Sequence, residues 1–412
     1  MTIHPLFPPV RQDGAVQRPG RVSEVFFAFL RLGLTSFGGP VAHLGYFRDD
    51  LVVRRRWMDD RAYADLVALC QFLPGPASSQ VGFAMGLQRA GVLGALAAFA
   101  AFTLPSAVLL VAFAGGAAVL GGPLAAGVIS GLQIVAVAIV AQAVWGMART
   151  LTPDAPRAGI AVVGLAFALL LPGAPGQLGA LAVGAVGGLL FLRGGLEPSS
   201  PALPSFGVPR AVAVICLVLL AFGLVGLPVL AAATGSGVAA LVDAFFRSGA
   251  LVFGGGHVVL PLLQAGVVET GWVSPEAFLA GYGVAQAMPG PLFTFSAYLG
   301  AVSDVGPGGI AGAAIALVAI FVPGFLVLTG VLPFWDAVRG KPRVRAAMGG
   351  ANAAVVGILG AALYTPVFTT AVTGPGALLL AVVGFVLLTA FRVPAWAVVA
   401  VGAVGGVMLA LT

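Results

Sequence analysis

The sequence contains very little charge. Only 8% of its 412 residues are Asp, Glu, Lys or Arg, whereas about 25% is usual in a soluble domain. So few charged side chains cannot cover the surface of a soluble chain of this length, and 60% of the residues are apolar. Several apolar runs exceed the ~18 residues that a membrane-spanning helix needs. The composition therefore excludes a soluble enzyme, a disordered chain and a peripheral protein, and it predicts a polytopic membrane protein.

Cysteine is scarce as well. Cys70 and Cys216 lie inside apolar runs with no CxxC pattern and no nearby histidine, which argues against a disulfide framework, a metal site or another bound cofactor. Residues 1–22 show no cleavable signal peptide and predict a cytoplasmic tail. The net charge of +6 comes mostly from short arginine clusters between apolar runs. This distribution is typical of cytoplasmic loops rather than of nucleic-acid binding.

Glycine and proline, by contrast, are abundant, with 60 and 29 residues, and they mark an internal repeat. The segment FLRLGLTSFGGP around Arg31 matches FFRSGALVFGGG around Arg247. Pro-Gly-Pro at 74–76 recurs at 289–291, and this separation is almost the same as that between Arg31 and Arg247. The motif VGAVGG also occurs twice. Ordered motifs at nearly constant spacing indicate a duplication. The predicted parts are a tail at 1–22, a first repeat at 23–193, a linker at 194–236 with one extra transmembrane helix at 211–233, and a second repeat at 237–412.

Loop charges predict that the two repeats have opposite orientations. The loop at 48–61 contains five arginines, whereas its counterpart at 266–276 contains no lysine or arginine. The uncharged loop at 120–122 corresponds to a segment at 339–345 with four basic residues. Since basic loops stay in the cytoplasm, the repeats are expected to be inverted, with the N-terminus inside. The expected fold is an all-α polytopic membrane protein whose broken helices form re-entrant hairpins, with about nine full spans plus four hairpins, or up to about 13 spans.

The Phe-Gly-Gly and Pro-Gly-Pro breaks are candidate anion sites. Irregular backbone at membrane depth is tolerated where it is buried in protein or lines a cavity, and half-helix N-termini present free amides to an anion. The alternative is that the breaks are packing kinks or tight turns. The candidate substrate-binding residues are Phe37, Gly38, Gly39, Pro40, Pro74, Gly75, Pro76, Ser78 and Ser79 in the first repeat, and Gly254, Gly255, Gly256, Pro289, Gly290, Pro291, Thr294 and Ser296 in the second.

Two arginines, Arg31 and Arg247, occupy equivalent positions inside apolar helices. A guanidinium at membrane depth costs at least ~2.5–3.5 kcal/mol and needs a partner or water. Its fork of donors suits a tetrahedral oxyanion, so both are candidate substrate-binding residues. The alternative is a structural arginine paired with Glu24 or Asp243.

Three residues are candidates for proton coupling: His43, His257 and Asp65. The two histidines follow the glycine motifs but do not align with each other, and a hydrogen-bonded structural histidine is the alternative. Polar pairs inside apolar segments, Gln71 with Gln286 and Gln133 with Asn352, fit interhelical hydrogen bonding at least as well as substrate contact.

At the level of motifs, the sequence resembles the bacterial chromate transporter (CHR) family. FLRLGLTSFGGP, RRRWMDD and QFLPGPASSQ carry the resemblance in the first repeat, and FGGGH with AMPGPLFTFSAYLG carries it in the second. The second repeat departs from the first in having FGGG where the first has FGGP, so the halves are not expected to contribute equally.

The resemblance implies a multi-pass carrier of the bacterial inner membrane that exports chromate and is driven by the proton gradient. The expected partners are chromate or a sulfate-like anion, protons and the lipid bilayer, and a homodimer is compatible with the sequence. A sulfate-type uptake carrier and an anion channel remain alternatives. A membrane enzyme is the weakest hypothesis because no catalytic constellation is present.

Overall fold

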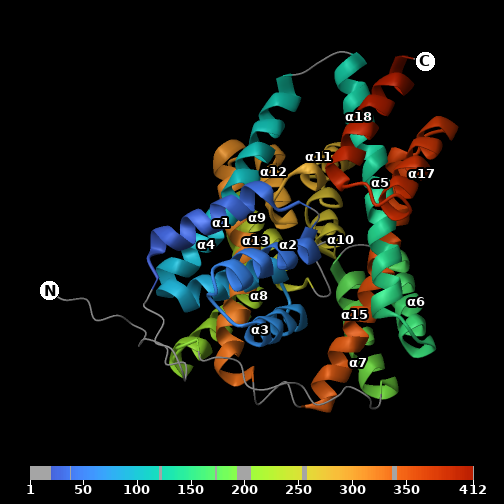
Figure 1. Cartoon of the computed structure of the whole chain (residues 1–412). Helices are drawn as coiled ribbons and strands as arrows, with labels where there is room; N and C mark the ends of the chain where they lie inside the picture. The colour runs from blue at the N-terminus through green and yellow to red at the C-terminus, as the bar shows by residue number, and fades with distance from the viewer. Residues whose placement is uncertain are drawn as a thin grey trace.

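The computed structural model describes residues 20–37, 39–119, 123–171, 174–192, 206–252, 258–335 and 341–411, and these residues contain helices and no strand. Five helical stretches are long and apolar enough to cross a membrane: Ala77–Gly116, Ala126–Leu151, Arg210–Thr234, Gly309–Phe334 and Pro342–Ala371. Several shorter apolar helices accompany them. This architecture agrees with the predicted polytopic membrane protein (Figure 1).

The helices of the first half are arranged around the two predicted breaks. They are α1 (Val22–Thr35), α2 (Gly39–Phe47), the π-helix η1 (Arg48–Arg54), α3 (Asp60–Phe72), α4 (Ala77–Val119), α5 (Pro123–Leu151), α6 (Ala155–Leu170) and α7 (Ala174–Phe191). The long α4 reverses at Ala90 and Gly91, whose dihedral angles are not helical. Its two arms touch backbone to backbone at Gly86 and Gly94, so α4 is a tight helical hairpin rather than one straight span.

The second half repeats this order after α8 (Arg210–Thr234). Its elements are α9 (Gly237–Ala250), α10 (Val259–Leu263), η3 (Gln264–Val268), α11 (Pro275–Ala287), η4 (Leu292–Thr294), α12 (Phe295–Val302), α13 (Gly309–Val331), η5 (Leu332–Phe334), α15 (Pro342–Ala362), η6 (Leu363–Phe368), α16 (Thr369–Ala371), α17 (Pro375–Thr389) and α18 (Ala395–Leu411). The π-helices η1 and η3 begin at Arg48 and Gln264, which are as far apart in the sequence as Arg31 and Arg247. Gly300 and Gly312 bring α12 and α13 together as Gly86 and Gly94 do within α4.

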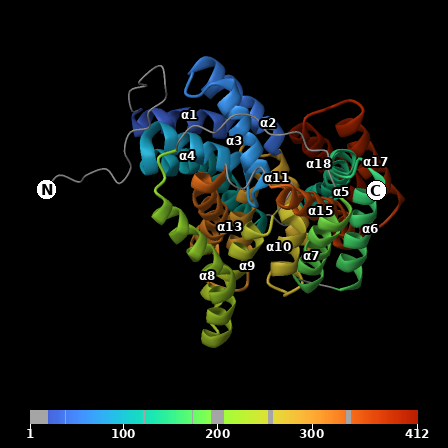
Figure 2. The ribbon, with the colours of Figure 1, turned by 90° about the horizontal axis from the view of Figure 1, so that it is seen from below.

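The helices pack in two groups. One contains α1 to α4, α8, α9, α12 and α13, and the other contains α5 to α7 and α15 to α18, while α10 and α11 lie between them and α11 packs mainly on α5. Figures 1 and 2 show these groups side by side, with α10 and α11 next to the second group. Helix α8 is largely uncovered, because only 11% of its apolar window is buried inside the protein. Its role as an extra span between the halves stays a prediction.

Within the second group, each half packs on the other through glycine. Helix α5 lies against α17 and α18, and α15 lies against α6 and α7. Gly131 of α5 faces Gly402, and Gly350 of α15 faces Gly188. The repeated VGAVGG motif therefore supplies the glycines that α5 and α15 approach, as expected for close helix packing in a membrane.

The predicted hairpin around the first break is present. Phe29 of α1 packs edge-on against Phe47 at the end of α2, with ring centroids 5.5 Å apart. Farther from the break, Trp57 Nε1 donates to Glu24 Oε1 at 3.1 Å. Both contacts require α1 and the α2–η1 segment to run antiparallel. The same holds for α11 and α12, since Tyr298 Oη donates to Ala277 O at 3.0 Å.

Candidate functional site

The first break in each half separates two short helices. In the first half, α1 ends at Thr35, Ser36 and Phe37 are extended or irregular, and α2 begins at Gly39. In the second half, α9 ends at Ala250 and α10 begins at Val259. The predicted site residues Gly38, Gly254, Gly255, Gly256 and His257 lie outside the described residues.

The second break is Pro-Gly-Pro in both halves. Gly75 has φ +117° and Gly290 has φ +98°, a region that favours glycine because a Cβ would clash with the backbone. The breaks end α3 and α11 and begin α4 and the η4–α12 segment. The flanking prolines lack an N–H, so the glycine supplies the only backbone donor within each Pro-Gly-Pro.

These two donors bind the opposite half. Gly75 N–H donates to Val252 O at 2.8 Å, and Gly290 N–H donates to Ser36 O at 2.9 Å. The two glycines are equivalent in the repeat, and so are Ser36 and Val252. Each half therefore joins its second break to the first break of the other half by a matching hydrogen bond.

The breaks also approach the long helices closely. A Cβ on Gly75 would lie 2.9 Å from Gly324 Cα in α13, and one on Gly290 would lie 2.8 Å from Ser106 Oγ in α4. Pro105 and Pro323 lie inside α4 and α13 next to these contacts. The described parts of the breaks therefore converge here: the first break and both Pro-Gly-Pro breaks, together with Val252 at the edge of the fourth.

Buried polar side chains surround this convergence. Ser36, His43, Ser78, Ser79, Gln80, Thr294 and Ser296 are each at most 4% exposed. Four of them have partners. His43 Nδ1 and Ser78 Oγ are 3.4 Å apart, Gln80 Nε2 donates to Pro74 O and Gly324 O, and Thr294 Oγ1 donates to Pro291 O.

Other polar atoms at the same place have no hydrogen-bond partner among the described residues. They are Ser36 Oγ, Ser79 Oγ, Gln80 Oε1, Ser296 Oγ and His43 Nε2. A buried polar atom left unpaired costs about 1–3 kcal/mol. Such a cluster inside an apolar protein suits a polar ligand or water.

The two predicted arginines lie away from the break contacts. Arg31 is exposed on α1, and its Nη1 is 4.0 Å from Asp50 Oδ1. Glu24, its expected structural partner, instead accepts from Arg89. Arg247 forms an ion pair with Asp243 on α9, as the structural alternative anticipated. Their role in anion binding stays a prediction.

Arg247 also lines a cavity of about 440 Å³ between α7, α9 and η3. Asp243 and Glu269 contribute carboxylates to the same wall, and Arg247 Nε is buried without a hydrogen-bond partner among the described residues. With two acids and one base, this cavity does not have the charge expected of a site for a free anion.

A second cavity, of about 310 Å³, reaches the breaks directly. Its wall includes Gly39, Gly290, Gln142, Gln286 and Arg392. Arg392, in the turn between α17 and α18, was not singled out from the sequence. One available signal was that it is the only charged residue after Arg345.

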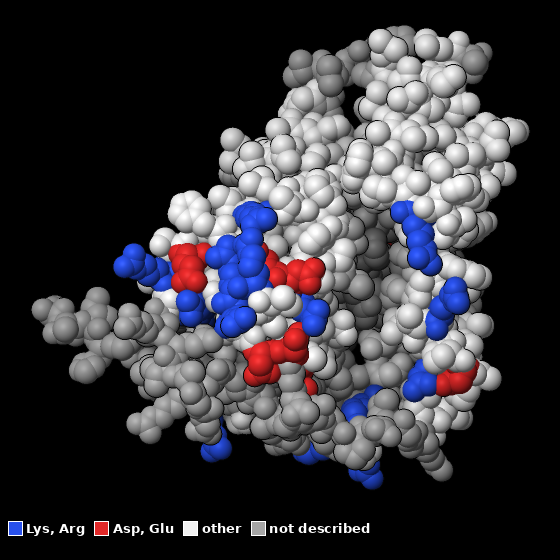
Figure 3. Space-filling model, viewed as in Figure 1, with Lys and Arg blue, Asp and Glu red and all other residues white. Residues whose placement is uncertain are grey.

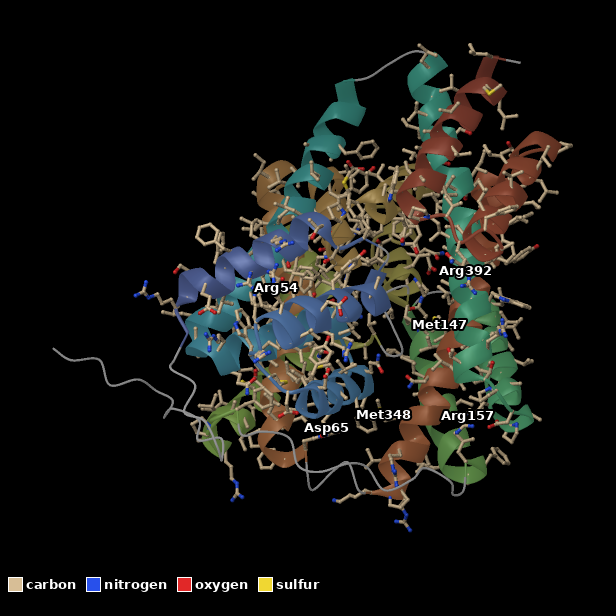
Figure 4. All side chains as sticks on the ribbon, in the orientation of Figure 1. Arg54, Asp65, Met147, Arg157, Met348 and Arg392 are labelled. Carbon is tan, nitrogen blue, oxygen red and sulfur yellow. The ribbon has the colours of Figure 1, made fainter. Side chains whose placement is uncertain are left out.

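The remaining predicted polar residues are dispersed. Asp65 is half-buried on α3 (Figure 4), and Gln71 is exposed. Gln133 Nε2 donates to Glu276 O of α11 at 3.0 Å, which fits interhelical bonding. Asn352 Oδ1 is buried with no hydrogen-bond partner among the described residues.

A helical, polytopic chain whose broken helices meet at a buried polar centre has the architecture of a membrane transport protein. The chromate transporter family model matches residues 23–192 and 239–407. The chain therefore belongs to the chromate transporter family, a family of transporters rather than enzymes.

Named relatives cover most of the chain. It is 29% identical to a chromate transport protein of Pseudomonas aeruginosa, over 84% of this chain and 81% of that protein. It is also 29% identical to a chromate transport protein of Cupriavidus metallidurans, over 88% and 87%, and to a probable chromate transport protein of Synechococcus elongatus, over 81% and 82%. No solved structure matches the chain.

Proposed function

We propose that this protein is a secondary transporter that exports chromate across the bacterial inner membrane in exchange for protons. The observation that carries the proposal is the meeting of the helix breaks, where each half bonds to the other and buried hydroxyls lack partners among the described residues. Membership of the chromate transporter family and the named relatives support chromate as the substrate.

The two halves, 23–193 and 237–412, are proposed to be inverted repeats joined by the linker at 194–236. The reciprocal hydrogen bonds of Gly75 and Gly290 support this arrangement, because a two-fold axis between repeats produces contacts in matching pairs. The reciprocal packing of α5 and α15 on the other half supports it as well. Rocking of one helix group against the other would then expose the centre to either side in turn.

In this mechanism the amino-terminal ends of α4 and the η4–α12 segment face the anion. Ser78, Ser79, Thr294 and Ser296 are proposed to add hydroxyl donors to the free amides. His43 is placed to exchange a proton there, because its Nδ1 is near Ser78 and its Nε2 has no partner among the described residues. Arg31 and Arg247 are proposed to attract the dianion as it enters and leaves.

Flux measurements in proteoliposomes test the function. We expect an interior-acid pH gradient to drive radiolabelled chromate into vesicles, and unlabelled chromate inside to accelerate exchange. Sulfate should compete as a second tetrahedral dianion. Chromate flux without pH coupling or counterflow would instead indicate a channel. Preferential transport of sulfate would change the assigned substrate.

The inverted repeat makes a separate prediction about topology. Accessibility tags inserted after Arg55 and after Glu269 should report opposite sides of the membrane, since α8 lies between the repeats. The two sites follow the equivalent π-helices η1 and η3, so each is the other's matched control. Labelling of both tags from the cytoplasm would contradict inversion.

A further inference from the structure

The cavity that reaches the breaks contains one isolated positive charge. Its described wall includes Arg392 and no aspartate or glutamate. No ion pair joins Arg392 to a carboxylate among the described residues. By contrast, Arg31 and Arg247 each have a carboxylate within ion-pair distance. Arg392 is itself exposed, so its charge is open to solvent and to a ligand in the cavity and is not neutralised by a carboxylate of the described residues.

The other polar groups of this cavity are hydrogen-bond donors. Gln142 of α5 and Gln286 of α11 line it with side-chain amides, and the Gln286 amide also lies within hydrogen-bond reach of Tyr282. Gln286 comes four residues before Gly290, the glycine that bonds to Ser36. The donors and the charge therefore gather beside one of the central break contacts.

The backbone at Arg392 supports a role other than ending the helix. Arg392 lies two residues beyond Ala390, the C-cap of α17, and has φ +56°. Glycine adopts this conformation without steric cost, whereas an arginine does not. Retaining a long cationic side chain there places its charge at the cavity wall; Figure 4 shows Arg392 over α5.

The size of the cavity suits a small hydrated anion. A volume of about 310 Å³ corresponds to about ten water molecules at ~30 Å³ each. A planar guanidinium donates two parallel hydrogen bonds to an oxyanion, which an ammonium cannot reproduce. The remaining oxygens of a tetrahedral dianion would then be available to the two glutamine amides.

We propose that Arg392, together with Gln142 and Gln286, forms the oxyanion-binding site of this transporter, and that the guanidinium of Arg392 selects tetrahedral dianions. This assignment rests on the proposed transport function. In this assignment the principal cation of the site is Arg392 rather than Arg31 or Arg247, the arginines at equivalent positions of the two halves. The two halves therefore contribute unequally to anion binding.

Equilibrium binding of radiolabelled chromate to the purified full-length protein tests the assignment. The informative substitution is Arg392→Gly, because glycine fits the positive φ of this position and removes only the side chain. We expect its thermal stability to equal or exceed that of the unmodified protein, while its chromate affinity falls at least tenfold. Arg392→Lys should retain part of the affinity, and Gln286→Leu should reduce it by a smaller factor.

Arg149→Gln is the matched control, because Arg149 is an exposed arginine at the end of α5 outside the wall of this cavity. It should bind chromate normally, and sulfate should displace chromate from both proteins. Chromate affinity within twofold of normal in folded Arg392→Gly or Arg392→Gln would overturn the assignment. If the unmodified, folded protein neither binds nor transports chromate, the proposed function itself fails, whatever the variants do.

Discussion

Alanine at Gly75 or Gly290 is expected to reduce chromate flux about tenfold or more. Both glycines have positive φ, and a Cβ on either would lie within 3 Å of an atom from another helix. The conformation alone costs a residue with a Cβ about 1–2 kcal/mol, and overpacking adds about 1–3 kcal/mol. The variant must shift the break, which lengthens its hydrogen bond to the opposite half. Vesicle flux, normalised to folded protein, measures the loss.

Gly91→Ala separates the two causes. Gly91 also has positive φ, +67°, but a Cβ there would meet nothing within 4 Å. This variant should therefore carry the conformational cost at the turn of α4 while leaving the break contacts in place, and its flux should stay near normal. Equal losses in Gly91→Ala and Gly290→Ala would assign the effect to backbone conformation and not to the meeting of the breaks.

Valine at Gly131 or Gly350 is expected to lower the thermal unfolding temperature by several degrees and to reduce the yield of folded protein. A Cβ on Gly350 would lie 2.6 Å from Gly188 Cα, and one on Gly131 would lie 2.8 Å from Gly402 C. These neighbours are backbone atoms of packed helices, so the helices must separate, at a cost of about 1–3 kcal/mol. Thermal unfolding of the purified protein in detergent measures it.

Gly146→Val provides the comparison on the same helix. Gly146 lies on α5 like Gly131, yet a Cβ there would meet nothing within 4 Å. Both valines have the same weak effect on helix propensity. A difference in unfolding temperature between the two variants therefore reports the packing of α5 on α18. Unfolding temperatures that match between Gly131→Val and Gly146→Val would show that close approach of the two halves contributes nothing.

Much of the helical framework was predictable because glycine and proline act locally. A Pro-Gly-Pro inside an apolar run ends a helix whatever surrounds it, so the breaks before Ala77 and Leu292 were located to the residue. Apolar length and loop composition likewise placed α8 to within one residue at either end. These signals require no knowledge of which helices meet.

The partners of charged and aromatic side chains were not predictable in this way. Asp50, rather than Glu24, lies beside Arg31. Trp57 and Trp335, which a position near segment ends suggests as interfacial anchors, are only 4% and 7% exposed and pack in the interior. Arg392 reaches the breaks only because α17 and α18 pack on α5, a contact between distant parts of the chain.

Charge is distributed unevenly over the surface. Figure 3 shows basic and acidic side chains gathered over α1, η1 and α3, whereas the upper part of that face is nearly uncharged. Local composition predicts such a cluster, since the loop at 48–61 contains most of these residues. The position of this cluster over α1 depends on the hairpin, because the hairpin brings the segment that follows α2 back toward the start of α1.

The hydrogen bonds between the breaks also constrain biosynthesis. Gln80, just after the first Pro-Gly-Pro, bonds to Gly324, which is 244 residues later in the chain, and the acceptor of Gly75 is supplied by Val252. When the first half has entered the bilayer, its breaks therefore have polar backbone groups whose final partners have not yet been synthesised. Since unpaired backbone groups are costly in lipid, these hairpins must remain near the membrane surface, or be shielded by water or a chaperone, until the second half has been translated past Gly324.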